Sequence, residues 1–81
     1  MIVDQDFDAA KDSVESVRKC GHEPAAAHFG RDAITAASTF QPHVVLLEFE
    51  LVDMDPFKLA CRLRGKAIVI AVTKLGTRLL R

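Results

Sequence analysis

"HVVLLEFELVDMDP" (residues 43–56) joins a continuous apolar run to a cluster of acids. A β-branched and aliphatic run without polar interruption is typical of a strand buried on both faces, as in a parallel sheet. The stretch therefore predicts a central parallel strand over residues 43–48. Four carboxylates stand at or after the end of this strand: Glu48, Glu50, Asp53 and Asp55.

On either side of this stretch the chain alternates between short apolar strands and helical periodicity. Further strands are predicted over residues 1–3, 23–29 and 67–73, with Pro24 placing the second at a sheet edge. Helices are predicted between Asp6 and Gly21, between Gly30 and Pro42, and from Asp55 to about Arg64. Right-handed crossovers then dictate an α/β fold, a doubly wound parallel sheet with helices on both faces.

Composition limits the class of protein. The chain has 81 residues, of which 49% are apolar, and its formal net charge is zero. This predicts one domain over residues 1–81, and nothing in the total charge favours nucleic acid or a membrane surface. No apolar stretch approaches the ~20 residues of a membrane span, and with three aspartates in the first ten residues no secretory signal is expected. A cytoplasmic location is expected, with Cys20 and Cys61 as buried thiols in a reducing compartment.

The two signs of charge are separated along the chain. Every acid lies at or before Asp55, whereas residues 56–81 carry seven bases and no acid. These bases fall between apolar positions, so they form either a solvated surface or a patch that binds phosphate or nucleic acid.

Acidic and polar residues also follow the predicted strand ends. Asp4, Glu48 and Thr73 each end a strand, and parallel strands bring these ends to one edge of the sheet, where ligands bind in such folds. Oxygen ligands of this kind suit Mg²⁺. The alternative is that the loop acids cap helices and solubilise the edge.

Four segments together resemble the receiver domain of response regulators in two-component phosphorelay signalling. They read "IVDQD", "CGHEPAAAHFGRDAITAA", "QPHVVLLEFELVDMDPFKLACRLR" and "AIVIAVT". The resemblance implies a flavodoxin-like sheet with strand order 2-1-3-4-5, an aspartyl phosphoacceptor after strand three, and a neighbouring Mg²⁺. It also implies a hydroxyl residue after strand four that senses the phosphoryl group.

The resemblance assigns these roles to five positions of the chain. Glu48 stands at the phosphoacceptor position, Asp4 and Gln5 at the acidic pair, the backbone carbonyl of Glu50 at a metal ligand, and Thr73 at the switch hydroxyl. The chain departs from the family by Glu in place of Asp at position 48 and by the lost charge at Gln5. The domain is also expected to be incomplete at its C-terminus, with about four strands and three helices.

The function expected from these departures is an atypical receiver in phosphorelay signalling. It would act as a protein-interaction module and not as an enzyme, with impaired or absent phosphotransfer, weak or no Mg²⁺ binding, and Glu48 as a phospho-mimic. Its expected partner is a histidine kinase or an output protein, without direct contact to nucleic acid or membrane. The alternatives are a Mg²⁺-dependent receiver that phosphorylates itself, and a fragment of a larger signalling protein.

Loss of the family's fifth strand would leave residues 67–73 at an open edge. An apolar edge without charge or proline exposes unpaired N–H and C=O groups, which favours pairing with another chain. A homodimer through this strand is therefore expected. Apolar surface is expected around Leu63, Ile68, Ile70 and Leu75.

Overall fold

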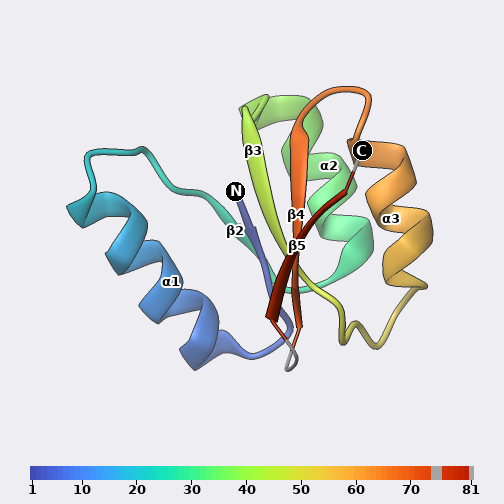
Figure 1. The fold of residues 1–81 in the computed structure, drawn as a ribbon, viewed down its shortest axis with the longest axis horizontal. Helices are drawn as coiled ribbons and strands as arrows, with labels where there is room; N and C mark the ends of the chain where they lie inside the picture. Colours follow the sequence, from blue (N-terminus) through green and yellow to red (C-terminus); the bar gives the residue numbers. More distant parts are fainter. Residues whose placement is uncertain (74–75, 81) are drawn as a thin grey trace.

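The computed structural model describes residues 1–73 and 76–80, with Thr73 and the last strand through their backbone alone. One five-stranded sheet is present, with the order β2-β1-β3-β4-β5 (Figure 1). Its strands are β1 (Ile2–Val3), β2 (Ala26–Ala27), β3 (Val44–Glu48), β4 (Ile68–Thr73) and β5 (Gly76–Leu80). The first four are parallel, which confirms the predicted central position of residues 43–48.

Helices lie on both faces of the sheet, as predicted. They are α1 (Phe7–Lys19), α2 (Gly30–Phe40) and α3 (Pro56–Leu63). In Figure 1, α1 lies on one side of the strands, and α2 and α3 lie together on the other. The fold is thus the doubly wound, flavodoxin-like arrangement. None of the three helices is both long and apolar enough to cross a membrane, within the part of the chain that the structure describes.

A fifth strand corrects the prediction of an open edge at β4. β5 pairs antiparallel with β4, from Val69 opposite Leu80 to Thr73 opposite Gly76. Only two residues separate the strands, and a connection that short permits an antiparallel hairpin but not a parallel crossover. Pairing with β5 satisfies the N–H and C=O groups that β4 would otherwise expose. The edge on which the dimer was predicted is occupied, and self-association stays a prediction.

Local sequence signals set the ends of α1 and α3. The Asp6 carboxylate caps α1 by accepting hydrogen bonds from the N–H groups of Asp8 and Ala9. Asp55 caps α3 by accepting from Phe57 N–H at 2.8 Å, and Pro56 fills the first turn. These caps are the ones predicted, since each depends on residues within three positions.

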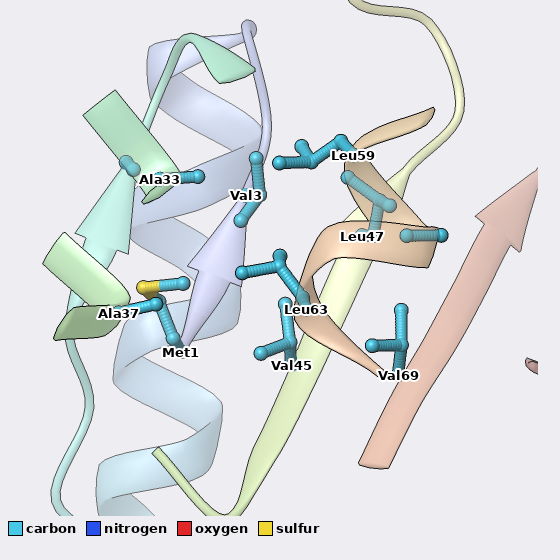
Figure 2. Packing of buried hydrophobic residues seen from close by; sticks show 11 residues of the cluster. Met1, Val3, Ala33, Ala37, Val45, Leu47, Leu59, Leu63 and Val69 are labelled. Carbon is cyan, nitrogen blue, oxygen red and sulfur yellow. The ribbon is translucent and has the colours of Figure 1, made fainter. Parts of the chain in front are cut away.

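The core lies between the sheet and the α2–α3 layer. Val3, Val45, Leu47 and Val69 project from three neighbouring strands, and none exposes any surface. Leu59 and Leu63 of α3 and Ala33 and Ala37 of α2 pack on them (Figure 2). Small residues on α2 allow the helix to lie close to the strands, while leucines on α3 fill the space over β3 and β4.

Coverage on the opposite face is less complete. Helix α1 contacts β1 and β2 on this face. Val44 of β3 is 39% exposed and Ile68 of β4 is 55% exposed. The apolar surface predicted around Ile68 is confirmed, but Leu63 is buried, and Leu75 lies outside the described residues.

Both cysteines are exposed, which overturns their predicted burial. Cys20 follows the last turn of α1, and Cys61 lies on the outer side of α3. The prediction of burial rested on the apolar character of cysteine. The packing of α3 through Leu59, Ala60 and Leu63 turns Cys61 outward.

The start of α2 is held by a distant loop. Its N-cap residue is Phe29, whose side chain forms no hydrogen bond with the start of the helix. Instead the Asp53 carboxylate, from the loop after β3, accepts from Gly30 N–H at 2.8 Å and from Arg31 N–H at 3.1 Å. Met54 then packs against Gly30, so closely that a Cβ at position 30 would overlap its Cγ and Sδ atoms.

The contact between Met54 and Gly30 predicts that alanine at position 30 destabilises the protein. Gly30→Ala should lower the free energy of unfolding by about 1–2 kcal/mol, because Met54 must move to relieve overpacking. Gly65→Ala is the matched control: a Cβ there meets nothing within 4 Å, so its effect should stay within about 0.5 kcal/mol. Urea denaturation followed by circular dichroism measures both, and equal stability of the two variants would contradict the close approach.

Candidate functional site

Parallel pairing brings the predicted site residues to one edge of the sheet. Val3 lies opposite Leu47 in the β1–β3 register, so Asp4 and Glu48 follow at neighbouring positions. They line a hollow of about 250 Å³ at this edge. Its lining residues are Asp4, Gln5, Asp6, Ala9, Glu48 and Glu50. Four of the five predicted site residues are therefore together.

Thr73 is the fifth predicted site residue. Its backbone ends β4 at the same edge, directly after Val72, which lies opposite Glu48. The Thr73 side chain lies outside the described residues, so its role as a switch hydroxyl stays a prediction.

Local hydrogen bonds fix the first acidic loop. Asp4 Oδ1 accepts from Asp6 N–H at 2.9 Å, while the Asp6 carboxylate is directed to the start of α1. The backbone N–H of Asp4 donates to the Ala27 carbonyl at 3.0 Å, which joins the loop to β2. The position of Asp4 is thus determined from both sides, by the strand before it and by the helix after it.

His28 supports this loop from β2. Its Nδ1–H donates to the Asp4 carbonyl oxygen at 3.0 Å, and its ring stacks on Phe7 with centroids 3.8 Å apart and planes 11° from parallel. The stacking also accounts for the position of Phe7, which is 61% exposed at the start of α1. Sequence spacing gave no signal for this pair, because the two residues lie on different elements.

Glu48 titrates above its ordinary range. Desolvation is the largest cause of its raised pKa, and the nearby charges of Asp4 and Glu50 raise the pKa further. The backbone N–H groups of Phe49 and Glu50 act in the opposite direction, since they stabilise the carboxylate. Glu48 therefore faces two like charges in the hollow while the amides that follow it favour its ionised form.

Gln5 brings an unsatisfied acceptor to the same hollow. Its Oε1 atom is buried and has no hydrogen-bond partner among the described residues. Leaving a buried acceptor unpaired costs about 1–3 kcal/mol. A cation or donor entering the hollow would remove this cost.

Comparison with solved structures identifies the fold. The receiver domain of the Francisella response regulator 1452 is similar, with a TM-score of 0.74 and 18% sequence identity. The similarity covers 88% of this chain and 63% of that chain, so this chain spans under two thirds of its neighbour's length. No family model matches the chain, and no curated protein matches it significantly. The chain has a receiver fold.

The donor set of this receiver-like hollow suits a hard cation. Asp4 and Glu48 offer carboxylate oxygens and Gln5 an amide oxygen, and Mg²⁺ is typically held by one or two carboxylates with waters completing its shell. No three acidic, histidine or cysteine side chains converge closely enough to hold a metal within the described parts of the chain. Any Mg²⁺ site here would draw on the Asp4 and Glu48 carboxylates, the unpaired Gln5 oxygen and the backbone carbonyl of Glu50 that the resemblance implies.

Two of the four acids named at the start take no part in the hollow. Asp53 caps α2 and Asp55 caps α3. Hydrogen bonds from Gly30 and Arg31 lower the pKa of Asp53, so its capping is present above the ordinary aspartate range and is lost as pH falls through its folded pKa. For these two acids the alternative of helix capping is correct, and Glu48 and Glu50 remain for the site.

The raised pKa of Glu48 predicts a pH-dependent effect of neutralising it. The stability that its protonated form contributes is complete below its unfolded pKa of about 4.5 and is lost as pH rises through the folded value. Glu48→Gln should therefore unfold like the parent near pH 3.5 and be more stable at pH 7, by about 0.5–1 kcal/mol. Urea denaturation at both values measures this. Glu15→Gln, on the exposed side of α1, removes the same charge far from the hollow and is the matched control.

Proposed function

We propose that this receiver-like domain is a signalling module that acts through protein contacts, with impaired or absent phosphotransfer and Glu48 as a phospho-mimic. The observation that carries the proposal is the position of Glu48. Its carboxylate lies in the carboxyl-edge hollow beside Asp4, where the amides of Phe49 and Glu50 stabilise its charge. A negative charge on Glu48 resembles part of what a phosphoryl group would add at this point.

Side-chain length opposes efficient phosphotransfer at Glu48. One extra methylene extends the carboxylate about 1.2–1.5 Å beyond the reach of an aspartate. In-line attack on a phosphoryl donor requires near-attack geometry, and a misplacement of about 1 Å can cost on the order of 100-fold in rate. The longer side chain instead occupies space that the phosphoryl group would take. These arguments favour a charged stand-in over a working acceptor.

The chain's own residues would also weaken metal binding. Mg²⁺, when bound, would neutralise the incoming phosphoryl oxygens and the carboxylates around them. Asp4 and Glu48 would hold it, but Gln5 contributes only a dipole where a carboxylate would contribute a charge. The like-charge repulsion that raises the pKa of Glu48 is the part of the site that a cation would relieve.

Partners follow from the same proposal. A module without its own chemistry transmits a signal by binding, and we expect a histidine kinase or an output protein as the partner. Direct binding of nucleic acid is not expected from a chain with zero formal net charge.

A charge introduced at position 5 tests the metal site. Gln5→Asp should bind Mg²⁺ about tenfold more tightly than the parent, equivalent to about 1.4 kcal/mol, because a carboxylate replaces an amide beside the cation. Gln5→Asn is the matched control, with the same short side chain and no charge. Amide chemical shifts of residues 4–6 and 48–50 during Mg²⁺ titration report binding directly. Equal affinity of all three proteins would mean that position 5 does not contact the metal.

Phosphodonor chemistry tests the role of Glu48. With acetyl phosphate and Mg²⁺ the unmodified chain should stay unlabelled, whereas Glu48→Asp should acquire a slow, partial label because the shorter carboxylate restores the attacking distance. Intact-mass spectrometry and radiolabel both read the product, and Glu15→Asp controls for labelling elsewhere. Stable label on the unmodified chain, mapped to Glu48, would favour the self-phosphorylating alternative and end the phospho-mimic proposal.

A further inference from the structure

A second hollow lies at the opposite, amino-terminal edge of the sheet, between the C-terminal ends of α2 and α3. Its volume is about 400 Å³, within the range of pockets that bind ligands. The floor is apolar: Ala37 of α2, Leu63 of α3 and Ala67 before β4 form it, and the fully buried Val45 of β3 lies beneath them. Such a floor favours an apolar group of about the size of one large side chain.

The rim of this α2–α3 hollow is polar and carries no negative charge. Ser38, Gln41, His43 and Lys66 line it, and none of the lining residues is acidic. Gln41 ends α2 in the left-handed conformation, with φ 52° and ψ 61°, which is uncommon for a residue other than glycine. A left-handed residue at this point is a common way for a helix to end, and the Gln41 N–H donates to the Ala37 carbonyl.

A row of bases leads away from the rim along α3. Lys58 and Arg62 are exposed and four residues apart on α3, so they lie on one side of the helix, and the exposed Lys66 follows three residues after its end. Lys66 lines the hollow together with Leu63 of α3 and Ala37 of α2. An acidic partner would meet Lys66 at the rim of the apolar hollow, with Arg62 and Lys58 further back along α3.

The combination selects one kind of occupant. The carbonyl ends of α2 and α3 point toward this edge and carry partial negative charge, so a small free anion gains little in the hollow itself. A peptide can separate the two interactions, with an apolar side chain in the hollow and carboxylates against the α3 bases. We propose that the α2–α3 groove binds an acidic peptide segment through one apolar anchor residue. This names the partner's chemistry for the proposed interaction module, and so rests on that function.

Direct binding measurements test the proposal on the full chain. The probe is a fluorescein-labelled synthetic peptide with glutamates on both sides of one phenylalanine, followed by fluorescence anisotropy. Binding should saturate at low salt and weaken as salt is added. Replacing the phenylalanine by serine, or the glutamates by glutamines, should each weaken binding at least about tenfold, since both halves of the interaction are required.

Variants of the protein locate the surface. Lys66→Glu and Arg62→Glu should each weaken binding about tenfold, while Lys11→Glu on α1, an identical charge reversal at an exposed position, should change it less than about twofold. Ser38→Trp should block the hollow, and Ser16→Trp on the exposed side of α1 is its control. Circular dichroism spectra and melting curves confirm that each variant folds.

Three results would overturn this assignment: equal effects of the Lys66 and Lys11 reversals, equal binding of the serine peptide, or no saturable binding. Tighter binding of a single-stranded RNA oligomer at the same salt concentration would assign the bases to nucleic acid instead. A dimer in sedimentation that is lost in Ser38→Trp and kept in Ser16→Trp would assign the hollow to self-association. The phosphodonor experiment reads Glu48 at the other edge of the sheet, so failure there and failure of peptide binding are distinguishable.

Discussion

Parallel pairing of β1 with β3 is the interaction on which the rest of this structure depends. Val3 and Leu47, paired in register, are both fully buried under the α2–α3 layer. A slip of one residue would turn their side chains to the opposite face, so burial fixes the register. That register also sets Asp4 beside Glu48, although neither residue contributes to the core. The candidate site is therefore positioned by packing on the other side of the strands.

The acids at the end of β3 and in the loop after it have two roles: some cap helices and others line the charged hollow. Asp53 reaches back across 23 positions to the start of α2, and Asp55 begins α3 two residues later. These two carboxylates are committed to backbone amides at the helix starts. Glu48, at the strand end, is left facing Asp4 in the hollow. The residues that cap helices and the residues that line the hollow thus lie in one short segment. Movement of this loop would affect α2 directly, because Asp53 bonds to the start of that helix.

The hollows at the two ends of the parallel strands differ in charge. At the carboxyl edge Asp4 and Glu48 repel each other, and a buried Gln5 oxygen lacks a partner within the described residues. At the amino edge an apolar hollow adjoins Lys66. The receiver fold separates these surfaces by the length of the strands. A charge change at one end of the strands can therefore be made without directly altering the other end.

The sequence by itself determined the features that depend on near neighbours. The unbroken apolar run of β3 predicted a central parallel strand, and Asp6 and Asp55 predicted two helix starts, because each signal lies within a few residues. Only the tertiary structure decided that Asp53 caps α2, since its partners lie more than twenty positions away. The periodicity of apolar residues likewise did not predict the pairing of β5 with β4. It follows from the cost of an unpaired edge, which exists only once the sheet has formed.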